Sequence, residues 1–267
     1  MTVSEWLLSH EAQVRLTAFL SVFALMIILQ RLFPRREVSG GWRRNVTNVT
    51  LVIVGTVILR VAFPLLAFDL AVDLQQRNSG LLQGLPNVAA VIIGVLLLEV
   101  VIYWQHRLMH TVPLLWRLHR VHHADTSFDV TTGVRFHPIE TALSMAIKLG
   151  IIYLFGIAPL AVLIFEIALS AGSLFTHANL RIPKAIDHYV RWLFVTPEMH
   201  RVHHSWHPDE TNSNYGFHLS LWDRLFRSYR DQPRDGHTGM TIGLHEFREP
   251  RQQTFPALLL NPFRPAR

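Results

Sequence analysis

Four long apolar runs in the first 176 residues constrain the fold more than any other feature of the sequence. A membrane-spanning helix needs about 20 mostly apolar residues. The last run is 36 residues long with Gly156 and Pro159 near its middle, which suits a helical hairpin. None is an uninterrupted apolar 20-mer, so a soluble protein with buried helices remains the alternative. The runs are Leu16–Gln30, Val49–Phe68, Leu85–Trp104 and Thr141–Thr176.

Composition favours the membrane. Hydrophobic residues make up 50% of the chain and charged residues 16%, against roughly 25% charged in an average soluble domain. The net charge of +6 comes with arginines beside the apolar runs, a placement typical of contact with lipid headgroups rather than nucleic acid. The absence of cysteine excludes disulfides, thiolate metal sites and cysteine nucleophiles. The N-terminus has no basic region before its apolar stretch, so we expect no cleaved signal peptide.

The positions of the charges predict a topology. Cytoplasmic loops are enriched in arginine and lysine, so the basic segment 31–44 should be cytoplasmic and the segment with Asp69 and Asp73 outside. Residues 105–137 and 177–267 then lie in the cytoplasm. We therefore predict an all-α integral membrane bundle of about three spans plus a hairpin, with a cytoplasmic helical cap. We expect a bacterial inner membrane rather than the endoplasmic reticulum.

Histidines cluster in three short motifs: "HRLMH" at 106–110 and "HRVHH" at both 119–123 and 200–204. Spacings of three and four residues place imidazoles on one face of a helix. Thr196 and Pro197 predict a helix start just before the third motif, and His177 stands alone at the end of the hairpin. Neutral imidazole is the commonest metal ligand, and nine histidines exceed the needs of one tetrahedral ion. The pattern therefore predicts a site for two metal ions.

The histidine pattern does not by itself identify the metal. Zinc, copper, iron and nickel all accept imidazole. A donor set of nitrogens at a membrane surface, in a chain without cysteine, favours redox iron acting on a lipid.

These motifs, together with "RFHPIE" at 135–140, "NYG" at 214–216 and "WDRLF" at 222–226, resemble the fatty acid hydroxylase/sterol desaturase superfamily. The resemblance covers roughly residues 85–230. It implies a non-haem di-iron oxygenase with N-terminal membrane helices at 1–84, a catalytic domain at 85–230 and a C-terminal tail at 231–267. The implied iron ligands are His106, His110, His119, His122, His123, His200, His203 and His204, with His177 as an additional ligand.

Several neighbouring residues have two interpretations. His137 could bind metal or anchor the turn that leads into the hairpin. Asp125 and Glu140 could accept hydrogen bonds from imidazole N–H groups, or cap helices and pair with arginines. The "NYG" and "WDRLF" motifs are interpreted as a turn and a packing contact that close over the metal site. Six further histidines are interpreted as ordinary surface or packing residues, and residues 258–267 as a poorly ordered tail.

The expected activity is hydroxylation or desaturation of a C–H bond in a lipid, such as a sterol or fatty acyl chain, with two iron ions and O₂. The lipid would enter from the bilayer, and electrons would come from a separate protein such as a ferredoxin or cytochrome b5. Substrate-binding residues and the substrate itself are not identifiable from the sequence. A membrane metal transporter or sensor and a zinc-dependent lipid hydrolase are the alternative functions.

Overall fold

A computed structural model describes residues 2–265, and within them the chain is all-helical, with isolated bridges in place of strands. The predicted all-α class is therefore confirmed. The longer helices are α2 (Glu11–Leu32), α3 (Gly41–Ala62), α4 (Ala67–Gln76), α5 (Asn87–Thr111), α6 (Pro113–His123), α7 (Pro138–Phe155) and α8 (Pro159–Thr176). The shorter ones are α1 (Val3–Ser9), α9 (Lys184–Val190), α10 (Pro197–His203), α11 (Pro208–Thr211), α12 (Leu221–Leu225), α13 (Gly236–Gly239) and α14 (Phe255–Leu260). Three 3₁₀ turns complete the fold: η1 (Thr132–Val134), η2 (Pro250–Gln253) and η3 (Asn261–Phe263).

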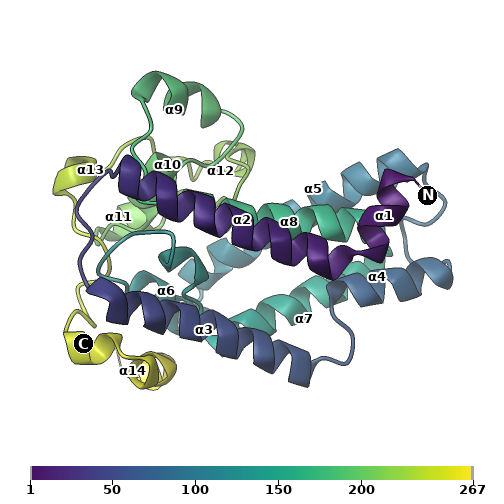
Figure 1. The fold of residues 1–267 in the computed structure, drawn as a ribbon, viewed down its shortest axis with the longest axis horizontal. Helices are drawn as coiled ribbons and strands as arrows, with labels where there is room; N and C mark the ends of the chain where they lie inside the picture. The colour runs from purple at the N-terminus through teal and green to yellow at the C-terminus, as the bar shows by residue number, and fades with distance from the viewer. Residues whose placement is uncertain (1, 266–267) are drawn as a thin grey trace.

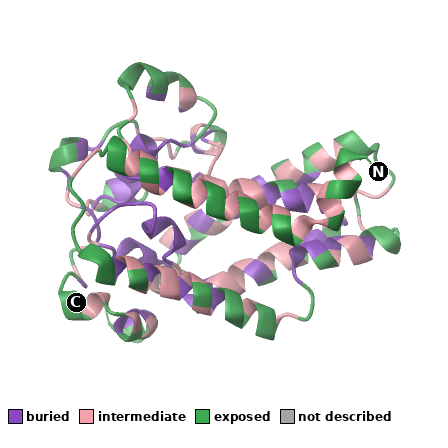
Figure 2. Cartoon of the chain, viewed as in Figure 1, coloured by how far each residue is buried: buried purple, intermediate pink, exposed green. Residues whose placement is uncertain are grey.

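Five helical segments are long and apolar enough to cross a membrane: Glu11–Leu32, Gly41–Gln76, Asn87–Thr111, Pro138–Phe155 and Pro159–Thr176. Their outer faces carry exposed leucines such as Leu16, Leu20 and Leu25. Figure 2 shows these long helices mostly exposed or half-buried along their length. A continuous apolar outer face on long helices is the surface that lipid tails solvate.

The helices are arranged in two zones along the long axis of the molecule (Figure 1). Helices α2, α3, α5, α7 and α8 run along this axis. One end of them is covered by α6, α9–α14 and the connecting segments, which we call the cap (residues 112–137 and 177–265). The helix ends next to the cap are the C-terminal ends of α2, α5 and α8 and the N-terminal ends of α3 and α7.

The hairpin predicted at 141–176 is present. Helix α7 ends at Phe155 and is followed by the C-cap Gly156, whose φ of 60° is left-handed, and α8 begins at Pro159. Gly80 packs against this turn so closely that an added Cβ would lie 2.2 Å from Cα of Gly156. The hairpin therefore sends α8 back toward the cap.

Two sequence expectations need correction. Helix α3 begins at Gly41, eight residues before the predicted run, because its first turns bury the polar residues Arg44 and Asn48 inside the protein. The expectation of a poorly ordered tail at 258–267 is wrong for its described part. Leu258 and Asn261 are buried there, and the Arg120 side chain donates to the Asn261 side chain at 2.9 Å. Residues 266 and 267 lie outside the described residues.

Candidate metal centre

All nine histidines singled out by the sequence come together where the cap meets the long helices. Helix α5 continues past Trp104 to Thr111, so it carries the first motif as predicted. Helix α6 carries the second motif, and His177 is the C-cap of α8. Helix α10 carries the third, with Thr196 as its N-cap accepting from the Met199 N–H at 3.2 Å. Eight of the nine histidines are buried, and His110 is half-buried.

The nine imidazoles divide into two groups, within each of which the possible ligand atoms lie within 4.8 Å of one another. The five-histidine group is His106, His110, His119, His123 and His203, and the four-histidine group is His122, His177, His200 and His204. The groups adjoin, since the rings of His123 and His204 stack with centroids 4.6 Å apart.

Each copy of "HRVHH" contributes to both groups. The first copy gives its i, i+4 pair, His119 and His123, to the five-histidine group and its middle His122 to the other. The second copy does the reverse: the i, i+4 pair His200 and His204 joins the four-histidine group and His203 the five-histidine group. The two helical turns therefore share the histidines between two sites in opposite ways.

Backbone carbonyls fix the orientation of four of the rings. Nδ1 of His106 donates to the Tyr215 carbonyl at 2.6 Å, and Nδ1 of His203 to that of Ser213 at 2.6 Å. Nδ1 of His177 donates to the Ser173 carbonyl at 2.7 Å. The fourth is His122, whose Nδ1 lies 3.3 Å from the Arg135 carbonyl. Because a carbonyl only accepts, the proton is on Nδ1, and Nε2 of each neutral ring presents its lone pair.

The Glu140 side chain fixes the orientation of a fifth ring, that of His119. Its Oε1 accepts from Nδ1 of His119 at 2.6 Å, one of the two roles the sequence left open for this carboxylate. A carboxylate behind an imidazole both fixes its tautomer and raises its basicity toward a metal.

Several Nε2 atoms, each with a lone pair, lie so close together that a cation between them would stabilise the arrangement. Nε2 of His106 and of His119 lie 3.1 Å apart, and Nε2 of His177 lies 3.0–3.1 Å from those of His122, His200 and His204. Within residues 2–265 both ring nitrogens of His110 and the Nε2 atoms of two more histidines, His123 and His203, are buried without a hydrogen-bond partner. Buried polar atoms left unpaired cost about 1–3 kcal/mol each. The donor set therefore fits two metal ions, one in each group.

The protonation of the cap histidines supports this fit. Burial and the neighbouring imidazoles hold the pKa values of His122, His123, His200 and His204 well below the usual range. Burial also lowers the pKa of His203 to about 3 and that of His177 to about 4. These rings are neutral at pH 7, the state in which imidazole binds metals.

His137 does not join either group. Its Nδ1 accepts from the Ile139 N–H at 3.1 Å and caps α7, while Nε2 lies 3.2 Å from the Leu259 carbonyl. Of the two roles left open by the sequence, the structure shows the turn anchor.

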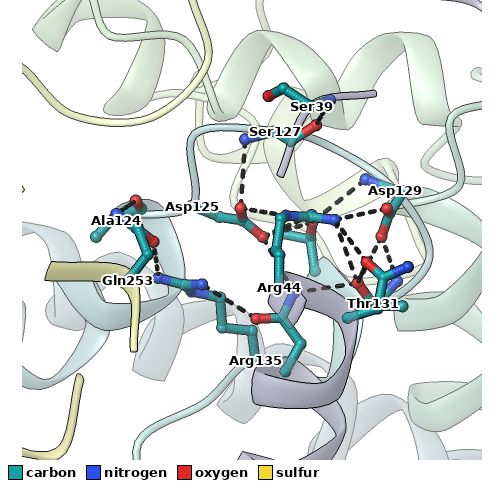
Figure 3. Close-up of polar contacts among 12 residues, drawn as sticks. Ser39, Arg44, Ala124, Asp125, Ser127, Asp129, Thr131, Arg135 and Gln253 are labelled. Carbon is teal, nitrogen blue, oxygen red and sulfur yellow. Dashed lines mark hydrogen bonds and ion pairs between the residues drawn. The ribbon is translucent and has the colours of Figure 1, made fainter. Parts of the chain in front are cut away.

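Asp125 has an arginine rather than an imidazole as its partner. Arg44 donates to both of its carboxylate oxygens, at 2.6 and 2.7 Å, and to Asp129 at 2.6 Å (Figure 3). Burial raises the pKa of Asp125, but the Arg44 guanidinium outweighs burial and lowers it to about 2. Pairing with an arginine was one of the two roles that the sequence left open, but the partner comes from α3, 81 residues earlier in the chain.

Sequence reasoning missed this supporting network. Asn48 accepts from the Arg135 guanidinium at 3.0 Å, and the same guanidinium donates to the Val121 carbonyl at 2.9 Å. Arg135 in turn offers its own carbonyl to His122. The available signal was the i, i+4 spacing of Arg44 and Asn48 at the start of an apolar run, which places two polar side chains on one helix face.

The "NYG" and "WDRLF" motifs form the turn that was expected. Asp223 accepts from the backbone N–H groups of Tyr215 and Gly216 at 2.7 and 2.9 Å. Burial raises the pKa of this carboxyl to about 6. The contact holds the Tyr215 carbonyl in place, and that carbonyl orients His106.

A cavity of about 840 Å³ lies between α2, α3, α5, α7 and α8. At one end its walls touch the histidines: Phe136 stacks on His122 with ring centroids 4.6 Å apart, and Phe217 lies 5.0 Å from the His106 ring. Its sides are mostly apolar. The cavity therefore extends through the interior of the helical bundle to the phenylalanines that pack against the candidate metal centre.

Comparison with known proteins places the chain among lipid-modifying enzymes. A family model described as fatty acid hydroxylase matches residues 91–228, just over half of the chain. The ornithine lipid hydroxylase OlsE of Rhizobium tropici is 32% identical over 234 residues, which cover 84% of this chain and 69% of that protein.

Two eukaryotic relatives match over a shorter region. The alkylglycerol monooxygenase of Xenopus tropicalis is 30% identical over 155 residues, covering 56% of this chain and 32% of that enzyme. Human lathosterol oxidase is 25% identical over 145 residues, covering 54% of this chain and 46% of that enzyme. The chain thus matches about a third of the former and just under half of the latter. No solved structure matches significantly.

Proposed function

The chain belongs to the fatty acid hydroxylase family, and we propose that it is a membrane-bound oxidoreductase that uses O₂ and two iron ions to hydroxylate or desaturate a lipid. The observation that carries the proposal is the convergence of nine largely buried imidazoles in two adjoining groups at the end of a membrane-spanning bundle. The relatives named for ornithine lipid, alkylglycerol and lathosterol support a lipid as the substrate class.

The two groups would each hold one iron. His106, His110, His119, His123 and His203 would bind the first, and His122, His177, His200 and His204 the second. When bound, the irons supply the activation of O₂ that oxidation of an unactivated C–H bond requires. We propose three parts of the chain: N-terminal membrane helices at 1–84, a catalytic domain at 85–230 and a C-terminal tail at 231–267.

The protein's own residues position and protect this centre. Carbonyls and Glu140 keep the protons on Nδ1 of five rings, so that Nε2 is available to metal. Phe136 and Phe217 form the wall between the histidines and the cavity, where they exclude water and admit a hydrocarbon chain. We place the centre on the cytoplasmic face, supplied with electrons by a separate protein.

Metal content tests the assignment of ligands. We expect the purified protein to hold two irons per chain, and His122→Ala and His203→Ala each to lower that content by at least half. His188→Ala is the control, because His188 lies exposed on α9 outside both groups. Unchanged iron content in both site variants would contradict the assignment.

Oxygen isotope labelling tests the reaction. Cells that express the protein under ¹⁸O₂ should form a lipid that carries ¹⁸O if the reaction is a hydroxylation, or one that has lost two hydrogens without ¹⁸O if it is a desaturation. Lipid turnover that continues without O₂ would instead indicate hydrolysis and refute the proposal.

A further inference from the structure

The end of the cavity farthest from the histidines is lined by charged side chains. Three cations and one carboxylate reach it from four different helices: Arg15 from α2, Arg60 from α3, Lys148 from α7 and Glu166 from α8. The walls between the two ends are mostly apolar, with residues such as Phe19, Val52, Ile53, Val57 and Leu174. The cavity therefore has one end next to the histidines, an apolar middle and a charged end. We call the charged end the basic end.

Within the basic end the positive charges exceed the negative ones. Glu166 is shared, since one oxygen lies 2.5 Å from Nζ of Lys148 and the other 3.1 Å from the Arg15 guanidinium. Arg15 also pairs with Glu11 at 3.1 Å. Among residues 2–265, Arg60 makes no ion pair or side-chain hydrogen bond; it is an exposed residue in the last turn of α3 that lines the same cavity. One cation more than the carboxylates neutralise thus faces the cavity.

Placing such a cluster of charges among membrane-spanning helices costs free energy, and a purely structural ion pair would not need four charged side chains. Ionisable side chains within membrane-spanning helices are unfavourable and usually mark a substrate or ion pathway. Lys148 and Glu166 would suffice as a simple pair between α7 and α8. The addition of Arg15 and Arg60 from two further helices gives a positive site, which attracts an anion.

The spacing between the two ends is defined by the helices that form the walls. Glu140, bonded to His119, precedes Lys148 by eight residues on α7, and Glu166 precedes Ser173, bonded to His177, by seven on α8. At 1.5 Å per residue these intervals correspond to about 12 and 10 Å. A chain anchored at the basic end would span this distance to reach the histidines.

We propose that the basic end binds the anionic group of the lipid substrate, a carboxylate or a phosphate, while the hydrocarbon chain runs through the apolar middle to the metal centre. This inference rests on the proposed function in taking the cavity as the lipid site. It assigns the substrate class as an anionic amphiphile, and it makes Arg60 a specificity-determining residue.

Binding to the purified protein tests the proposal directly. The probes are a radiolabelled long-chain fatty acid, its methyl ester and an alkyl phosphate of equal chain length. Wild-type protein should bind the acid or the phosphate roughly tenfold more tightly than the ester, the value of one charge-assisted contact. Whichever anion binds more tightly identifies the natural group. Equal affinity for all three probes would overturn the proposal.

Substitutions test whether the basic end causes the preference for the acid or the phosphate over the ester. Arg60→Gln should remove the preference for the anion without changing ester binding, and Arg60→Lys should restore most of it. Arg77→Gln is the matched control, because Arg77 is exposed, pairs with Asp73 and lies outside the cavity. The melting temperature of each variant shows that it is folded. Retention of the full preference by Arg60→Gln would overturn the role of Arg60.

Oxidation assays on the same proteins separate this proposal from the proposed function. If the wild type oxidises lipids but acid and ester react equally in wild type and Arg60→Gln, the basic end is only structural and the oxidase assignment stands. If no lipid is oxidised but the binding preference follows Arg60, the basic end stands and the oxidase assignment fails.

Discussion

Glu140 is the carboxylate that orients one of the nine histidines, whereas four others are oriented by backbone carbonyls. It also lines the cavity, so it belongs both to the metal centre and to the proposed lipid site. His137, three residues earlier in the same "RFHPIE" motif, is committed to capping α7. Two residues of one motif thus have different roles, and the contacts of each side chain identify which role it has.

Replacing Glu140 tests this role. Glu140→Gln keeps an oxygen acceptor for Nδ1 of His119 but removes its charge, so the imidazole becomes a weaker ligand. We expect iron affinity to fall about 10-fold to 100-fold, measured by titration of the metal-free protein with Fe²⁺. Glu249→Gln, at an exposed position, should leave the affinity unchanged. An unaltered affinity in Glu140→Gln would show that its contact with His119 does not serve metal binding.

At the scale of helices and loops, the position of α3 determines how the second histidine motif is held. Arg44 and Asn48 on its first turns bind the segment that follows α6, through Asp125 and Arg135. These contacts act together with others from the bundle: Gln30 of α2 accepts from the Val130 N–H at 3.1 Å, and Ser173 of α8 donates to the Gly133 carbonyl at 2.8 Å. The ion pair therefore joins a membrane helix to the metal-binding cap.

Replacement of Arg44 should destabilise the contact between α3 and the cap. Arg44→Met leaves Asp125 and Asp129 buried without their cation, and loss of one partner of a buried pair typically costs about 3–5 kcal/mol. We expect a lower melting temperature and earlier loss of iron on heating, followed by calorimetry and metal analysis. Arg43→Met is the matched control, since Arg43 is exposed next to Arg44. Equal stability of the two variants would contradict the role of the buried pair.

At the scale of the whole molecule, the histidine-bearing elements all face one end of the bundle. Helices α5 and α8 end there, and α3 and α7 begin there. The basic segment 31–44 lies at the same end, where Arg35 pairs with Glu198 of α10 at 2.8 Å. The basic segment and the cap thus share one end of the bundle, and the charge asymmetry predicts that this end is cytoplasmic.

The absence of cysteine makes this prediction simple to test. Gln76→Cys, at the end of α4 far from the cap, should react with a membrane-impermeant maleimide in intact cells. Glu249→Cys, exposed on the cap, should react only after lysis. The unmodified chain should not be labelled. The opposite labelling pattern would place the metal centre outside the cytoplasm.

The amino-acid sequence by itself determined the helical class, the membrane runs, the hairpin and the nine clustered histidines. These features depend on local periodicity, which is encoded within 10–20 residues of chain. The repeated "HRVHH" motif could thus be recognised as two helical faces without any knowledge of what surrounds them.

Only the tertiary structure decided how those histidines divide between two sites, since each group combines residues from separate helices. It also decided the pairing of Arg44 with Asp125, the helical C-terminus and the basic end of the cavity. Each of these joins segments tens of residues apart in the chain. No local pattern encodes such contacts, because they form only when the packed helices bring distant side chains together.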